Sequence, residues 1–172
     1  MSVDPSADLA SRVLRASELR GDFVLSSGRR SSVYFDKFRF LGDPTLLREV
    51  ALAVAGLVPA EATHLAAPEG AATLLVAVVA IETGLPLSVV RREPKAYGTM
   101  SRVEGYAPPS ARVALIEDVS TTGGQVLAAA RAIEDRGAAV AAIILALDRG
   151  GAEALARAGY DVRSVVTARP DE

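Results

Sequence analysis

The chain has 172 residues, half of them hydrophobic, and a mean hydropathy of +0.27, which predicts one globular domain with a sizeable core. A net charge of −2 argues against a nucleic-acid surface built from excess positive charge. The absence of cysteine excludes disulfides and thiolate metal sites, and the single histidine, His64, excludes a multi-histidine metal site. We find no secretory signal and no apolar run near the roughly 20 residues that cross a bilayer, so we expect a cytoplasmic protein with no membrane partner.

The N-terminal part predicts a helix followed by a β-hairpin. Apolar side chains at helical spacing predict the helix over residues 6–19. Residues 21–36 hold two short β-like runs around a basic turn that contains Gly28. Such a hairpin could present hydroxyls, Arg29 and Arg30 to a flat anionic ligand. Alternatively, it is a solvent-exposed turn flanked by core aromatic side chains.

From residue 43 onward, helical and strand patterns alternate. The helices are predicted over residues 44–57, 70–83, 124–136 and 152–158. The strands are predicted over residues 63–67, 87–90, 113–116, 140–147 and 162–166. Because strands separated by helices form right-handed crossovers, this order predicts an α/β fold with a mainly parallel sheet and helices on both faces.

Ligands of such sheets bind beyond the carboxyl ends of the strands. The loops that meet there are predicted to be residues 67–72, 91–104, 117–124 and 148–151.

One stretch carries the clearest functional pattern, a buried strand that ends in two acids and a loop of small residues. The apolar residues 113–116 are followed by Glu117 and Asp118. The next loop, residues 120–124, has hydroxyl side chains and two glycines before a strong helix former. Backbone N–H groups at the positive end of a helix dipole bind anions, and glycines let the backbone approach a ligand. Two carboxylates would repel a phosphate bound beside them unless a hydroxyl-rich or cationic group lay between the carboxylates and the phosphate. A ribose with bound Mg²⁺ fits this position. An ordinary turn capped by threonine is the alternative, but it requires neither the acids nor the double glycine.

The connection formed by residues 91–104 is long for an α/β protein, and long loops are usually lids or disordered. The segment holds four cations, and bringing them together would be costly unless an anion were bound among them. They are Arg91, Arg92, Lys95 and Arg102. A pyrophosphate leaving group supplies such an anion. The alternative is a solvated loop with incidental basic residues.

Taken in order and spacing, these motifs resemble orotate phosphoribosyltransferase. The matching segments are FVLSSGR at residues 23–29, YFD at 34–36, RREPKAYGT at 91–99, the acid and glycine loop at 116–124, and LDR at 147–149. The resemblance covers nearly the whole chain and implies a type I phosphoribosyltransferase fold. Residues 1–40 would form the first helix and a small hood, and residues 41–172 the core of a single domain.

The resemblance also implies an activity. The phosphoribosyl group would pass from 5-phosphoribosyl 1-pyrophosphate (PRPP) to orotate, giving orotidine 5′-monophosphate and pyrophosphate in pyrimidine (UMP) biosynthesis. It implies Mg²⁺ as the cofactor and a homodimer whose lid acts in the partner subunit's site. PRPP and water, rather than a protein side chain, would hold the metal.

The site residues follow from the same resemblance. Those implied to bind PRPP are Arg91, Arg92, Lys95, Tyr97, Glu117, Asp118, Val119, Ser120, Thr121, Thr122, Gly123, Gly124 and Gln125. Those implied to bind orotate are Ser26, Tyr34, Phe35, Thr121 and Arg149. Lys95 and Asp118 are the implied catalytic residues, Lys95 for the departing charge and Asp118, with Glu117, for the ribose hydroxyls.

Several positions depart from the family's pattern. Ser26 stands where some members have Lys, and Arg92 stands where Lys is common. Tyr97 stands where His is common. Residues 66–72 carry alanines where the pyrophosphate loop usually has glycines, and Met100 and Ser101 replace a more glycine-rich or basic lid tip. Two alternatives stay open: a phosphoribosyltransferase for another base, which would not call for Arg149, and a non-catalytic regulator on the same fold.

Overall fold

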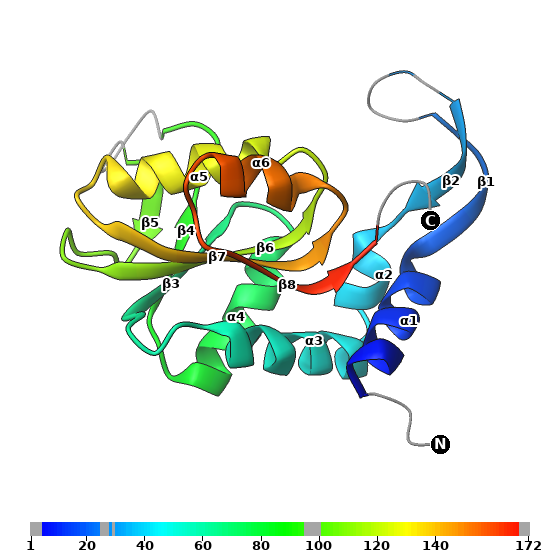
Figure 1. Cartoon of the computed structure of the whole chain (residues 1–172), viewed down its shortest axis with the longest axis horizontal. Helices are drawn as coiled ribbons and strands as arrows, with labels where there is room; N and C mark the ends of the chain where they lie inside the picture. Colours follow the sequence, from blue (N-terminus) through cyan, green and yellow to red (C-terminus); the bar gives the residue numbers. More distant parts are fainter. Residues whose placement is uncertain (1–4, 25–27, 29, 95–100, 169–172) are drawn as a thin grey trace.

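The computed structural model describes residues 5–24, 28, 30–94 and 101–168, and places them in two sheets and six helices (Figure 1). The helices are α1 (Pro5–Ser17), α2 (Lys37–Leu41), α3 (Pro44–Leu57), α4 (Ala72–Thr83), α5 (Gly124–Glu134) and α6 (Gly151–Arg157). The strands are β1 (Glu18–Val24), β2 (Arg30–Phe35), β3 (His64–Pro68), β4 (Leu87–Val90), β5 (Val103–Gly105), β6 (Arg112–Ser120), β7 (Ala139–Asp148) and β8 (Val162–Thr167). None of these helices has the length and apolar character needed to span a bilayer.

The larger sheet has the strand order β5-β4-β3-β6-β7-β8. All neighbouring strands in it run parallel except β5, which pairs antiparallel with β4. Strands β1 and β2 form a separate antiparallel hairpin that stands away from the sheet beyond α2 (Figure 1). The predicted mainly parallel α/β sheet is therefore confirmed.

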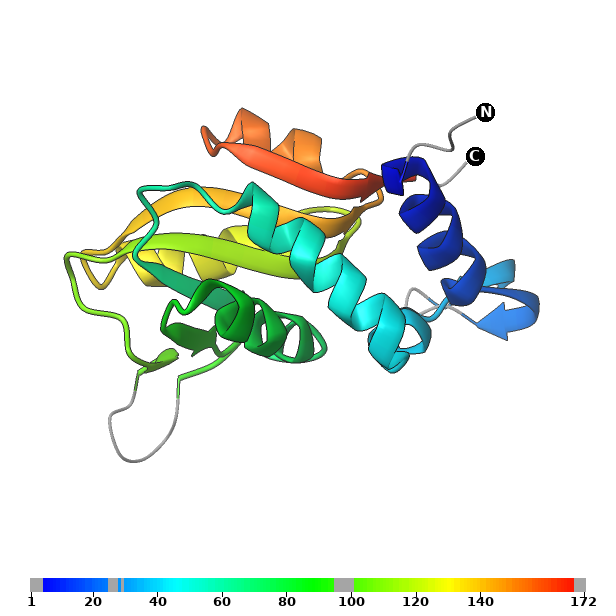
Figure 2. The ribbon, with the colours of Figure 1, turned by 90° about the horizontal axis from the view of Figure 1, so that it is seen from below.

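Helices cover both faces of this sheet, α3 and α4 on one side and α5 and α6 on the other (Figures 1 and 2). The alternation of side chains along β6 explains how one strand serves both faces. Ala114 and Ile116 pack in the cluster that contains α3 and α4, whereas Val113 and Leu115 pack in the cluster that contains α5. Both sets are buried, which accounts for the unbroken apolar run of this strand.

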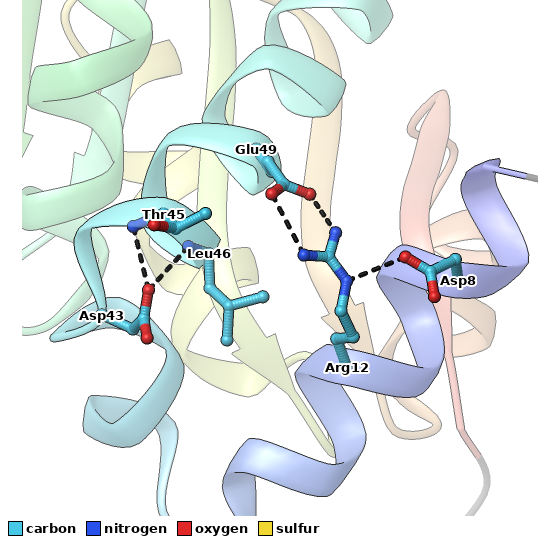
Figure 3. A network of polar contacts seen from close by, with 6 residues as sticks. All are labelled: Asp8, Arg12, Asp43, Thr45, Leu46 and Glu49. Atoms are coloured by element: carbon cyan, nitrogen blue, oxygen red, sulfur yellow. Dashed lines mark hydrogen bonds and ion pairs between the residues drawn. The ribbon is translucent and has the colours of Figure 1, made fainter.

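The first helix is part of the main core, because Leu9 and Val13 of α1 are buried in the same cluster as α3 and α4. Figure 3 shows a polar contact that fixes this packing, in which the Arg12 guanidinium of α1 donates to both carboxylate oxygens of Glu49 on α3. Arg12 Nε also lies 2.9 Å from an oxygen of Asp8. The start of α3 is fixed nearby by the Asp43 carboxylate, which accepts hydrogen bonds from the first-turn N–H groups at 2.9 and 3.0 Å (Figure 3).

Near the N-terminus, one predicted helix end is wrong and one helix was not predicted. The first helix ends at Ser17 rather than at residue 19, because the chain from Glu18 onward pairs with β2. The Ser17 carbonyl accepts the N–H of Asp36 at 2.9 Å, which joins the end of the helix to the end of the hairpin. Asp36 then caps the unpredicted helix α2 by accepting the N–H of Phe38 at 3.0 Å.

Two further corrections concern the sheet. The predicted loop of residues 91–104 contains the start of strand β5, and the N–H of Arg91 donates to the carbonyl of Arg102 at 2.7 Å, directly beyond the β4–β5 pairing. Strand β6 runs to Ser120 instead of ending at residue 116, so Glu117 and Asp118 lie within the strand. The remaining predicted helices and strands have the right type, with ends that match or differ by at most two residues.

Candidate active site

Two buried acids occupy the carboxyl-terminal part of β6. Glu117 is 4% exposed and Asp118 is fully buried. The Asp118 carboxylate accepts the N–H of Val119 at 2.7 Å, and the Glu117 carboxylate accepts the N–H of Asp118 at 3.2 Å. These hydrogen bonds fix both side chains at the edge of the sheet where a ligand of a parallel sheet binds.

Lys37 forms an ion pair with one of these acids, Asp118. Its Nζ lies 2.8 Å from Oδ2 and 3.2 Å from Oδ1 of Asp118. The alternation of side chains along β6 explains this contact. The Asp118 side chain lies on the same face of the sheet as Ala114 and Ile116, and α2 packs against that face. Lys37 was not predicted from the sequence, because a lysine at the start of a short helix carries no local sign of a partner 81 residues away.

The Asp118 carboxylate is closed off from solvent beside this cation. Although the Lys37 ammonium is close to Oδ2, its geometry is not that of a hydrogen bond, and Oδ2 accepts none from the described residues.

Burial raises the pKa of Glu117 well above the usual range of a carboxylic acid, and the adjacent Asp118 carboxylate raises it further through a hydrogen bond and its charge. The folded protein therefore holds a proton that the unfolded chain releases near the ordinary carboxylate pKa. The resulting stabilisation is complete at low pH and is lost as the pH rises through neutrality.

We expect Glu117→Gln to raise the melting temperature relative to wild type more at about pH 8 than at about pH 5. The amide needs no proton uptake on folding, whereas the wild-type carboxyl takes up a proton, at a cost in stability that is larger at pH 8 than at pH 5, which is close to its unfolded pKa. Thermal unfolding at the two pH values measures this, with the exposed Glu153→Gln as the matched variant. A melting-temperature difference that does not change with pH would contradict the raised pKa.

The predicted phosphate loop lies against the loop that follows β7. Ser120 pairs with Asp148 in register, and the N–H of Arg149 donates to the Ser120 carbonyl at 2.8 Å. The Asp148 carboxylate accepts the N–H groups of Gly150 and Ala152 at 2.9 and 3.1 Å, which holds this second loop in place. A Cβ on Gly151 would collide with the Ser120 side chain, so glycine is required for the two loops to approach this closely.

Helix α5 begins at this loop without a side-chain cap. Its N-cap is Gly123, which has a φ of 76° and carries no side chain. The hydroxyl of Thr122 accepts only the N–H of Gly124, at a long 3.5 Å. The alternative of an ordinary threonine cap is therefore not what the structure has. Thr121, Thr122, Gly124 and Gln125 are exposed around a helix start whose N–H groups have no side-chain cap.

Two of the predicted orotate residues come together from distant parts of the chain. The Arg149 guanidinium lies over the ring of Phe35, 4.9 Å from its centroid. Tyr34 is 42% exposed and packs against Phe23, with ring centroids 5.4 Å apart. The structure thus places Phe35 with Arg149, and Tyr34 on the hairpin beside Phe23.

A basic cavity of about 260 Å³ contains the first part of the predicted lid. Its lining residues are Pro68, Val90, Arg91, Arg92, Arg102, Gln125, Ala128 and Ala129. Glu69, which the sequence analysis did not single out, joins this segment to the loop after β3, because its carboxylate accepts the N–H of Arg92 at 2.9 Å and lies 3.9 Å from the Arg91 guanidinium. The cavity brings two of the predicted PRPP arginines next to the start of α5.

The other predicted residues can be placed only in part. Val119 is half-buried and Ser120 is buried in the last two positions of β6. Ser26, Lys95 and Tyr97 lie outside the described residues.

Sequence comparison finds close relatives, although no family model matches the chain. A protein from Nocardioides sp. (strain ATCC BAA-499 / JS614) named orotate phosphoribosyltransferase is 40% identical over 163 residues, which cover 94% of this chain and 91% of the relative. The chain belongs to the orotate phosphoribosyltransferase family.

Solved structures of the orotate phosphoribosyltransferase family share the fold. The enzyme from Aeropyrum pernix is 38% identical and superposes with a TM-score of 0.78 over 92% of this chain and 93% of its own. The Mycobacterium tuberculosis H37Rv orotate phosphoribosyltransferase in complex with PRPP is 28% identical, with a TM-score of 0.78 over 94% of this chain and 95% of its own. The type I phosphoribosyltransferase fold with its mainly parallel sheet is thereby confirmed.

Proposed function

We propose that this protein transfers the phosphoribosyl group from PRPP to orotate, releasing pyrophosphate and forming orotidine 5′-monophosphate for pyrimidine biosynthesis. The observation that carries this proposal is the buried pair Glu117 and Asp118, followed directly by the uncapped start of α5, in a chain 40% identical to proteins named for this activity.

PRPP would lie across the carboxyl end of β6. Its 5′-phosphate is proposed to bind the N–H groups of residues 121–125, at the positive end of α5. Its ribose hydroxyls are proposed to donate to the two acids in the carboxyl-terminal part of β6, because carboxylates are hydrogen-bond acceptors. The reaction is expected to pass through an oxocarbenium-like transition state, which a nearby carboxylate stabilises by its negative charge.

The leaving pyrophosphate would be bound by cations from the predicted lid. Arg91 and Arg92 already line a basic cavity beside α5, and Lys95 and Tyr97 are proposed to complete the set. Mg²⁺ bound to PRPP would neutralise part of the pyrophosphate charge. Glu117 and Asp118 supply carboxylate oxygens at this end of β6, and oxygen is the ligand type that Mg²⁺ prefers, so the site fits a metal that PRPP and water would hold.

Orotate is proposed to bind beside Phe35 and Arg149, with Ser26, Tyr34 and Thr121 as further contacts. An aromatic face and a guanidinium suit a flat, carboxylated pyrimidine. Because orotate is already an anion, the reaction needs positioning and exclusion of water more than it needs a strong base.

We expect Arg149→Ala to raise the KM for orotate by roughly tenfold to a hundredfold, with a much smaller change in the KM for PRPP. The lost interaction is a charge-assisted hydrogen bond to the substrate carboxylate. Steady-state kinetics with each substrate varied in turn measures this, and the exposed Arg157→Ala on α6 is the matched variant. Equal changes in both KM values would indicate that the Arg149 side chain acts only through its packing against Phe35.

An assay of orotate consumption with PRPP and Mg²⁺ tests the proposed function directly. We expect orotate to be consumed and pyrophosphate released in equal amounts, with no reaction when adenine or another base replaces orotate. Reaction with another base alone would establish the first alternative. PRPP binding by calorimetry without any turnover would establish the non-catalytic regulator, which the alanines of residues 66–72 motivate.

The proposed enzyme is a cytoplasmic homodimer in which the lid of one subunit completes the site of the other, and no membrane or nucleic-acid partner is proposed. Leu74 and Ile81 lie on one face of α4, seven positions apart, and are 46% and 80% exposed. Apolar side chains in this arrangement are suited to burial against a second copy.

A further inference from the structure

Lys37 lies in a segment that touches both halves of the proposed site. It is the first residue of α2, directly after the cap Asp36, and only two residues beyond Phe35. Phe35 contacts Arg149, whereas Lys37 contacts Asp118. The segment between the hairpin and α2 therefore reaches the predicted base side and the predicted ribose side at once.

The Lys37 ammonium compensates the burial of the Asp118 carboxylate. A carboxylate that is fully buried loses its hydration and needs a cation or hydrogen-bond donors in its place. Within the described part of the chain, Lys37 is the cation at ion-pair distance from Asp118.

The contact places a partly exposed cation beside a buried acid. The Lys37 side chain is 38% exposed and lies close to both carboxylate oxygens of Asp118, whose own side chain is fully buried. The ammonium therefore fixes the orientation of a carboxylate that solvent does not reach.

We propose that Lys37 is a positioning residue that holds the Asp118 carboxylate in a fixed orientation for the ribose hydroxyls of PRPP. The inference rests on the proposed function and adds a residue that the family resemblance did not supply. Lys37 acts through Asp118, so its loss should impair PRPP binding more than orotate binding.

The test compares Lys37→Met and Lys37→Arg with Arg39→Met. Arg39 lies two residues further along α2 and is exposed, so its replacement makes the same charge change without touching Asp118. We expect Lys37→Met to weaken PRPP binding in calorimetry, and to raise the KM for PRPP, by about tenfold or more, with little change in the KM for orotate. Lys37→Arg should restore most of the loss, and Arg39→Met should match wild type.

A second measurement does not depend on substrate. Melting temperatures of Lys37→Met, Asp118→Asn and the double variant form a cycle, and we expect Lys37→Met to lower the melting temperature much less in the Asp118→Asn background. Additive effects would overturn the inference, as would PRPP binding that Lys37→Met leaves unchanged or that Arg39→Met weakens equally. Wild-type protein that binds no PRPP would instead refute the proposed function, so the two failures are distinguishable.

Discussion

Asp118→Asn is expected to reduce kcat/KM for PRPP by about a hundredfold or more while the protein stays folded. The amide has nearly the same shape, so the core around β6 keeps its packing. It carries no charge, however, and therefore binds the ribose hydroxyls more weakly and gives no stabilisation to a positively charged ribose ring. Lys37 loses its partner, but its side chain is exposed enough to turn toward solvent.

Calorimetry of PRPP binding and steady-state kinetics measure the two parts of this effect, and circular dichroism checks the fold. Asp135→Asn is the matched substitution, since Asp135 is an exposed residue at the end of α5. Unchanged PRPP binding together with unchanged turnover would show that the ribose does not bind at Asp118.

A mixture of Lys95→Ala and Asp118→Asn subunits is expected to recover about half of the wild-type activity per heterodimer. Each parent dimer has a defect at both sites and should be nearly inactive. If the lid acts in the partner subunit's site, one site of the heterodimer carries both defects and the other carries neither. If the lid serves its own subunit, each site carries one defect and mixing restores nothing.

The activity of the mixture is followed after subunit exchange, which mass spectrometry of differently tagged subunits confirms. Exchange without recovery would assign Lys95 to its own subunit, and a monomeric protein at assay concentration would exclude a shared site altogether. A wild-type mixture carrying the same tags shows whether tagging itself lowers activity.

The parts of the fold that could be predicted are those with a strong local pattern. The apolar run before Glu117, the small-residue loop and the helix after it required only side-chain periodicity and glycine placement. Helix α3 was placed with both ends correct, because Asp43 and Pro44 are an N-cap and a first-turn residue of the usual kind.

The missed parts depend on contacts between distant segments. Helix α2 has five residues and strand β5 has three, too few for a periodic pattern. The continuation of β6 through two acids was not predicted, because carboxylates at strand positions look like the end of a strand until the neighbouring β7 and the cation of Lys37 are present. The contact of Glu69 with the Arg92 backbone likewise joins two loops whose proximity only the parallel pairing of β3 and β4 establishes.

The hydrogen bond from the Arg91 N–H to the Arg102 carbonyl has a consequence for how this enzyme family can vary. Together with the β4–β5 pairing, it ties the two ends of the lid segment at the edge of the sheet, and the Arg102 guanidinium reinforces it by donating to the Arg91 carbonyl at 3.2 Å. The entropic cost of closing a loop grows only slowly with its length, so residues can be inserted or deleted between these two positions with little effect on the sheet. The predicted lid can thus differ in length without a change in the sheet, and the corresponding segment of a relative could be transplanted between Arg91 and Arg102 without redesigning the core.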